Sequence, residues 1–324
     1  MFLGGKGMKK LSIKEKKELD VKESFDYFIR KCEIKNLSPR TIATHKDHFR
    51  IFNLFLESKN IYTMQGITIK IMDDFIFYLK DDRKCKGMTI NCYLRGLRVF
   101  LYFCMEENYM PKYKINLIKV TKQIKETYTD EELYKILKKP SLKNCEFSEF
   151  KTWVFSSYLL ATGNRITSAL NIKIGDLDFE SGTIQVNTTK NRKAQIIPMS
   201  TALSGVLKEY LLYRKGETSD YLFCDKFGGK PDRRTYQGMI EKYNHARGVI
   251  KKSAHLYRHT FAKKWILNGG DIFRLQKILG HSDLSMVKEY VNMFGNDILI
   301  DFNKYNPLDN MDCIKSNDKI KLKA

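Results

Sequence analysis

The sequence lacks several features that would point to other classes of protein. It has no run of about 18 apolar residues, so we expect no membrane-spanning helix. No apolar stretch follows its basic N-terminus, so no secretory signal is predicted. None of its seven cysteines forms a C-x-x-C pair, which argues against a zinc site or a disulfide framework and fits a reducing cytoplasm. It also lacks a Walker-type loop and clustered carboxylates, so neither ATP nor a metal ion is an expected cofactor.

Acidic residues are also in short supply. The 324 residues include 58 Lys and Arg against 37 Asp and Glu, which gives a net charge of +21 at pH 7. This balance predicts a polyanionic partner, most simply nucleic acid, bound with salt-sensitive affinity. The alternative is a basic protein from a proteome rich in Lys and Asn. A hydrophobic fraction of 43% indicates folded protein, and the length suffices for two domains with separate cores.

Local patterns divide the chain into segments. We predict a basic N-terminal lead (1–20), an all-helical domain (21–110), a Lys-rich linker (111–128), a second domain (129–305) and a C-terminal tail (306–324). The linker is placed where helical periodicity is lost. The second domain is expected to begin at a capping box, in which a threonine at 129 precedes a glutamate three residues later.

The first domain is predicted to contain four helices, over about 21–34, 39–59, 68–79 and 89–107. Ser38 followed by Pro39 marks the start of the second helix, which we expect to point Leu54 inward and His45 outward. His45 with His48 would suggest a metal site, but no third ligand is near, so a solvated helix face is favoured. Basic side chains on the second and fourth helices are either solvated or line a DNA groove: Arg40, Lys46, Arg95 and Arg98.

The second domain is predicted to be mainly helical with one small β-hairpin. A long apolar helix over about 149–161 ends at Gly163, and Arg165 starts a new short helix. Alternating apolar residues on either side of a basic turn predict the hairpin within 183–199. A short strand is expected at 221–223 and helices over 200–215 and 233–247. The last of these begins with Arg233 and Arg234 and is a candidate for the DNA major groove.

The stretch from His255 to Tyr290 contains the remaining candidate catalytic residues. His255 and Arg258 form H-x-x-R and share a helix face near Ser253, the expected N-cap. The other side of this helix would bury the apolar set Leu256, Phe261, Trp265, Ile266 and Leu267. Gly280 ends the next short helix and places His281 in a turn before Tyr290. These are groups that could hold a phosphodiester and attack it. Taken singly, each also fits an ordinary helical bundle.

The series Arg165, Lys190, His255, Arg258, His281 and Tyr290, in this order, resembles the catalytic set of the tyrosine recombinase (phage integrase) family. The resemblance covers about residues 20–310. It implies a mainly α fold, in which an N-terminal helical core-binding (SAM-like) domain precedes a tyrosine-recombinase catalytic domain with a small β-sheet. One position departs from the family pattern, because Ser168 stands where an acid usually follows the first arginine by three residues. This departure bears on how the catalytic cations are oriented.

The resemblance and the side-chain chemistry together imply a role for each residue. Arg165 and Arg258 present planar forks to the phosphate oxygens and stabilise the charge of the transition state. Tyr290 is the nucleophile, and His255 is the candidate to take its proton. Lys190 sits where the family has its general acid, next to Arg192 and Lys193, and Arg192 is a further candidate for DNA contact. His281 would hydrogen-bond a phosphate oxygen. The product would be a 3′-phosphotyrosyl bond, made without ATP or metal.

Several functions remain open within this chemistry. A mobile-element integrase is favoured over an Xer-like dimer resolvase, since the lead is too short for an additional arm-binding domain. A type IB topoisomerase uses the same chemistry as a monomer, and an inactive DNA-binding regulator is the alternative of another class. The expected partners are double-stranded DNA at a specific site, three further copies in a tetramer on paired sites, and an accessory directionality factor. The tail either docks onto a neighbouring protomer or folds back. The protein is expected in the cytoplasm, at the nucleoid.

Overall fold

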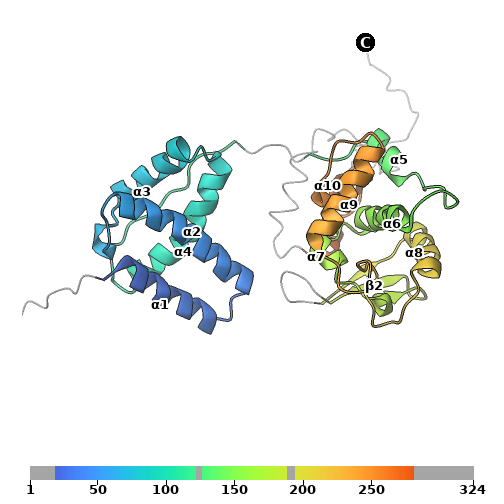
Figure 1. Ribbon diagram of the computed structural model, residues 1–324, viewed down its shortest axis with the longest axis horizontal. Coiled ribbons are helices and arrows are strands. Elements are labelled where there is room, and N and C mark those ends of the chain that lie inside the picture. The colour runs from blue at the N-terminus through green and yellow to red at the C-terminus, as the bar shows by residue number, and fades with distance from the viewer. Residues whose placement is uncertain (1–18, 122–125, 188–193, 281–324) are drawn as a thin grey trace, which may run out of the picture. The chain divides into compact units, whose positions relative to one another are not determined.

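The computed structural model describes residues 19–121, 126–187 and 194–280 (Figure 1). The chain forms two compact units, one reaching Gln123 and the other starting at Ile124. The elements are mostly helical with one small sheet, as the sequence predicts. Among the described residues, no helix combines the length and apolar character that a membrane crossing requires.

The first unit contains the four predicted helices, each within two residues of its expected bounds. They are α1 (Val21–Ile34), α2 (Pro39–Ser58), α3 (Ile69–Phe77) and α4 (Gly87–Glu106), with a 3-10 turn η1 (Met64–Gly66) and a π turn η2 (Tyr78–Asp82). Side chains cap three of the helix starts: Asp20, Ser38 and Thr68 each accept a hydrogen bond from the first turn. Ser38 with Pro39 therefore starts α2 as expected.

An aromatic cluster holds the first unit together. The Phe25 and Phe49 rings stack at 3.7 Å, and Phe100 meets both edge-on. Two expectations for α2 were wrong. Leu54 is 47% exposed, and His45 is half-buried, with its ring edge-on to Phe28 at 5.3 Å. The buried face of α2 therefore excludes Leu54 and reaches His45, and so differs from the face that the apolar pattern indicated.

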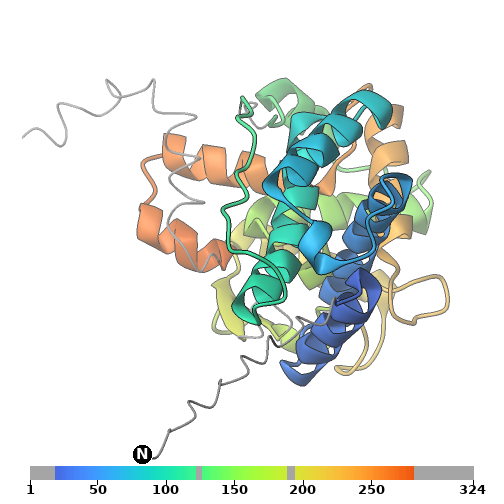
Figure 2. The same cartoon turned by 90° about the vertical axis from the view of Figure 1, so that its left-hand side faces the viewer.

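The stretch after α4 packs against the first unit. The Ile115 side chain is buried, and its backbone N–H donates to the hydroxyl of Tyr102. The side-chain amide of Asn91 pairs with both the N–H and the C=O of Ile118, at 3.0 and 2.9 Å. In Figure 2 the segment 108–121 is the green trace running along the helices of this unit. Part of the stretch that we expected to be a linker therefore belongs to the fold of the first unit.

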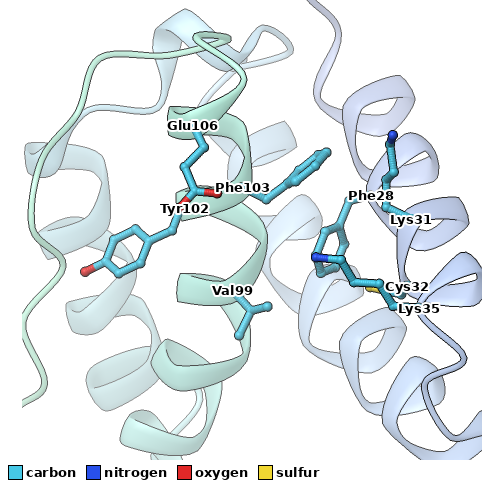
Figure 3. Close-up of a pocket in the computed structure, with 8 residues that line it drawn as sticks. All are labelled: Phe28, Lys31, Cys32, Lys35, Val99, Tyr102, Phe103 and Glu106. Carbon is cyan, nitrogen blue, oxygen red and sulfur yellow. The ribbon is translucent and has the colours of Figure 1, made fainter.

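A shallow groove lies between α1 and α4. Figure 3 shows Phe103 pointing from α4 toward Phe28 on α1, while Tyr102 points away from α1. Lys31 and Lys35 lie along one edge of the groove and Glu106 along the other. The groove is therefore apolar at its floor and charged at its rim.

The second unit is built around helix α6 (Phe147–Thr162), which packs against four others: α5 (Asp130–Leu137), α8 (Thr201–Arg214), α9 (Arg233–Ala246) and α10 (Ala254–Leu267). Ten residues of α6 are buried, and four of them are polar: Lys151, Thr152, Ser156 and Thr162. Burial of this helix therefore extends beyond a single apolar stripe. The predicted capping box at the start of α5 is present, with Thr129 and Glu132 bonding each other's backbone N–H. Helices α7 (Ile166–Ala169) and α11 (Ile272–Leu279) complete the unit.

A three-stranded antiparallel sheet flanks these helices. Its order is β1 (Leu177–Asp178), β2 (Thr183–Val186) and β3 (Gln195–Pro198), with Ile184 opposite Ile197. The predicted hairpin corresponds to β2 and β3, and β1 was not foreseen. The strand expected at 221–223 was wrong, because only an isolated bridge joins Tyr221 to Lys173.

Candidate active site

Arg165 is placed by a tightly bonded turn at the end of α6. Gly163 ends the helix in the left-handed region, at φ 61°. The next residue, Asn164, is buried; its N–H donates to the hydroxyl of Thr162 and its side-chain amide to the hydroxyl of Tyr158 at 2.8 Å. Arg165 follows as the N-cap of α7. Within the described chain its guanidinium has no recorded hydrogen bond or ion pair, so it is available to a ligand.

Arg258 is held in a different way. It is 5% exposed, and its two terminal nitrogens donate to the carbonyls of Gly163 and Leu279, both at 2.8 Å. Both carbonyls end a helix, where backbone C=O groups lack an intrahelical partner. Arg258 therefore joins α10 to the Arg165 turn and to the end of α11. We expected Arg258 on the helix face opposite the apolar set, and its burial was not foreseen.

His255 lies in the first turn of α10. Ser253 caps this helix as predicted, by accepting a hydrogen bond from the backbone N–H of His255 at 3.3 Å. Part of the ring is shielded from water although the residue remains exposed. This shielding, followed by the positive charges of Arg233, Arg258 and Arg165, holds the pKa of His255 below its ordinary value of 6.5. The lowered pKa favours the neutral imidazole, which is the form that can accept a proton.

The same electrostatic effect shows which residues come together. Arg165 lies 93 positions before Arg258, so the sequence alone does not show that the two side chains come together. The charges of both arginines nevertheless lower the pKa of the His255 imidazole. Arg233, at the start of α9, joins them. We predicted Arg233 as a DNA-binding residue on a separate helix, and its nearness to His255 was not foreseen.

The start of α10 is fixed from α9. The side-chain amide of Gln237 donates to the carbonyl of Lys252, and its oxygen accepts from the N–H of Ala254 at 3.5 Å. One turn further along α10, the buried hydroxyl of Tyr257 lies 3.1 Å from the Ser156 hydroxyl on α6. Neither Gln237 nor Tyr257 was singled out from the sequence. The only sign of Gln237 in the sequence was its position one helical turn after Arg233, on the same helix.

The apolar side of α10 differs in part from its prediction. Leu256 is buried, whereas Phe261, Trp265, Ile266 and Leu267 are only partly buried. Phe261, Trp265 and Ile266 pack on a small cluster formed by Ala262, Leu275 and Leu279, so they hold α11 against α10.

Strands β2 and β3 are each anchored where they border the segment 188–193, which contains Lys190. At the end of β2 the side chain of Asn187 donates to Asp176 at 2.8 Å, and the other carboxylate oxygen of Asp176 accepts from the N–H of Lys173. At the start of β3 the amide of Gln195 donates to the carbonyls of Lys277 and Ile278 in α11. Lys190 and its neighbours Arg192 and Lys193 lie outside the described residues.

His281 and Tyr290 also lie outside the described residues, as do the predicted tail and the basic lead up to residue 18. Gly280, immediately before His281, ends α11 as predicted, with φ at 61°. Ser168, at the family's acidic position, is buried on α7, and its backbone N–H donates to the carbonyl of Arg165 at 2.9 Å. The described part of the chain contains no cluster of three or more His, Cys, Asp or Glu side chains that could hold a metal ion.

The basic residues predicted to contact DNA lie at several places. Arg40 and Lys46 on α2 and Arg95 on α4 are exposed, and these two helices pack together. Arg98 is half-buried, with its guanidinium 5.4 Å from the ring of Tyr102. Arg234 is exposed on the first turn of α9. Their contact with DNA stays a prediction.

Comparison with known proteins agrees with this geometry. Residues 126–296 match the phage integrase family and residues 20–124 match the phage integrase SAM-like domain. The tyrosine recombinase XerD of Staphylococcus saprophyticus is 27% identical over 284 residues, which cover 84% of this chain and 94% of that protein. The tyrosine recombinase XerC of Oceanobacillus iheyensis is 26% identical over 280 residues, covering 83% and 90% of the two chains.

Two solved structures share the fold. The integrase of transposon Tn1549, bound to transposon right-end DNA, has a TM-score of 0.72 at 19% identity and covers 88% of this chain and 99% of that one. The XerH recombinase bound to a palindromic difH substrate has a TM-score of 0.67 at 20% identity, covering 86% and 83%. The chain belongs to the phage integrase family of tyrosine recombinases, the enzymes that cleave and rejoin DNA strands through a tyrosine nucleophile.

Proposed function

We propose that the protein is a site-specific recombinase whose catalytic residues are Arg165, Lys190, His255, Arg258, His281 and Tyr290. One observation supports this most directly: the charges of Arg165 and Arg258 converge on His255, from segments that are far apart in the sequence. A neutral imidazole beside two guanidinium groups suits a site that must bind a phosphate anion and also accept a proton.

The proposed reaction proceeds in one displacement for each strand. The Tyr290 oxygen attacks the phosphorus while its proton passes to His255, and the bond from phosphorus to the 5′ oxygen breaks. Lys190 protonates that leaving oxygen, and His281 donates to a phosphate oxygen. The two arginines stabilise the charge on the phosphoryl oxygens in the transition state. The phosphotyrosyl bond conserves the energy of the broken ester, so a second 5′ hydroxyl can reverse the reaction without ATP.

A nicked suicide substrate tests this proposal. The protein should become covalently attached to the 3′ end of the cut strand, and Tyr290→Phe should abolish attachment while DNA binding persists. Cut DNA that never carries protein would contradict the mechanism. Binding without attachment in the unaltered protein would favour the inactive regulator.

We further propose that the recombinase integrates and excises a mobile element, acting as a tetramer on two paired DNA sites in the cytoplasm. Sedimentation on paired sites separates this assembly from a monomeric topoisomerase. An accessory directionality factor would be detected as a protein that changes the ratio of integration to excision.

A second role is favoured by the curated relatives. XerD and XerC match this chain over at least 90% of their own lengths, which supports a dimer resolvase. The DNA flanking the gene distinguishes the two roles, since inverted repeats or transfer genes would indicate a mobile element. Accumulation of chromosome dimers after deletion of the gene would indicate the resolvase.

A further inference from the structure

Gln195 links two segments that carry different catalytic groups. It is the first residue of β3 and follows Lys190 by five positions in the chain. Its side-chain amide donates to two consecutive carbonyls more than eighty positions along the chain, those of Lys277 and Ile278, the latter at 2.8 Å. These carbonyls belong to the last turn of α11, which leads through Gly280 into His281.

The end of α11 needs such donors. The last carbonyls of a helix have no partner further along it. Here the carbonyl of Ile278 accepts from Gln195 and that of Leu279 from Arg258 at 2.8 Å, while the carbonyl of Lys277 accepts both from Gln195 and from the backbone N–H of Gly280 at 3.0 Å. Arg258 also donates to the carbonyl of Gly163, beside Arg165. The end of α11 therefore contacts the start of β3 directly and is joined through Arg258 to the turn before Arg165. Figure 2 shows α10 and α11 as a pair of orange helices.

Gly280 provides the space for this contact. A Cβ atom at this position would lie 2.7 Å from the side-chain oxygen of Gln195, closer than real Cβ atoms come to other atoms. The residue also adopts φ 61°, which disfavours any other side chain. The glycine before His281 thus serves both the end of α11 and the close approach of β3.

We propose that Gln195 is a positioning residue, which holds the start of β3, five residues after Lys190 in the chain, against the end of α11, the helix that precedes His281. This inference rests on the proposed function, in which Lys190 serves the leaving oxygen and His281 a non-bridging oxygen of the same phosphate. Two groups that act on one phosphate must keep a fixed separation, and an error of about 1 Å in such placement can cost on the order of a hundredfold in rate. Gln195 spans the two segments directly, with no intervening residue.

Two variants and a control test the contact itself. Gln195→Ala removes the amide, and Gln195→Glu keeps its size but replaces the donor with an acceptor that faces two carbonyls. Gln185→Ala is the matched control, because this glutamine bonds within the hairpin to Asn187. Hydrogen exchange across 272–280 should accelerate about tenfold in both Gln195 variants and stay unchanged in the control. Unchanged exchange in the Gln195 variants would overturn the inference, whether or not the protein cleaves DNA.

The functional part is tested by single-turnover formation of the covalent adduct. Gln195→Ala and Gln195→Glu should slow it about a hundredfold on ordinary DNA. A substrate with sulfur at the 5′ bridging position has a leaving group that needs no acid. On this substrate the rate of adduct formation by the Gln195 variants should therefore recover by about tenfold or more. Arg165→Ala should show no such restoration. Cleavage by the Gln195 variants at the rate of Gln185→Ala, or an equal defect on both substrates, would overturn the positioning role. Absence of any adduct with the unaltered protein would instead refute the proposed function.

Discussion

Arg165 and Arg258 carry the same group but have different structural roles. Arg258 is buried and bonds two helix-terminal carbonyls, whereas the Arg165 guanidinium has no recorded partner in the described chain. A charged donor removed from two buried carbonyls leaves them unsatisfied. Arg258 therefore contributes to folding as well as to the proposed chemistry, whereas Arg165 contributes to the proposed chemistry alone.

This difference predicts separate effects of substitution. Arg258→Ala should lower the free energy of unfolding by about 3 kcal/mol, from two lost charged hydrogen bonds. Arg165→Ala should change it by about 0.5 kcal/mol or less, as at other sites without packing. Both should lose most adduct formation while retaining some DNA binding. Urea unfolding gives the stabilities, and equal losses for the two variants would contradict the assigned difference.

The lowered pKa of His255 leads to a second prediction for a single residue. Because its folded value lies below 6.5, the imidazole takes up its proton at a lower pH in the folded state than in the unfolded chain, where it titrates near 6.5. The folded state therefore loses stability from this group below that pH. Magnetic resonance titration of labelled histidine should place the His255 midpoint below 6.5, and Arg233→Gln should raise it. An unchanged midpoint in that variant would show that Arg233 lies too far away to act.

Single residues were predictable from the sequence where the cause is local. Ser38, Thr129 and Ser253 cap their helices because a hydroxyl can reach the next turn of the same chain. The burial of Arg258 could not be predicted, because its partners are 95 and 21 positions away. For the same reason the partners of Gln195 were not foreseen.

At the scale of elements, prediction depended on length and periodicity. The hairpin was found from the alternation of Ile184 and Val186, both of which are buried. Strand β1 has two residues, Leu177 and Asp178, too few to show any period. The segment after α4 has no helical period, yet it is held by long-range hydrogen bonds that no local pattern can show.

Substitution of Asn91 tests how much the segment after α4 contributes to the free energy of unfolding. It is 4% exposed, and its side chain makes both hydrogen bonds of the pair with Ile118. Asn91→Ala should lower the free energy of unfolding by about 2 kcal/mol, since two bonds are lost in a buried place. Asn53→Ala is the matched control, because its amide bonds only Glu57 one turn along α2. Equal unfolding midpoints for the two variants would mean that the segment after α4 adds nothing.

At the scale of the whole molecule, the two units have separate hydrophobic cores. One core runs from Val21 to Ile115, and the other begins at Tyr128. This separation explains why the division into two domains could be predicted from the sequence, since each stretch carries enough apolar residues to bury its own core. The position of the boundary was harder to predict, because an extended segment can pack without any periodic signal.

The boundary can be tested with isolated fragments. A fragment of residues 19–121 contains the whole core of the first unit and should unfold cooperatively in urea. A fragment of residues 19–110, which ends where the domain expected from periodicity (21–110) ends, lacks the buried Ile115 and the bonds of Ile118 to Asn91. It should be less stable by about 4 kcal/mol, roughly half from burial of the apolar side chain and half from the two hydrogen bonds. Fragments of equal stability would show that residues 111–121 act only as a connection, and the first unit would then end with α4.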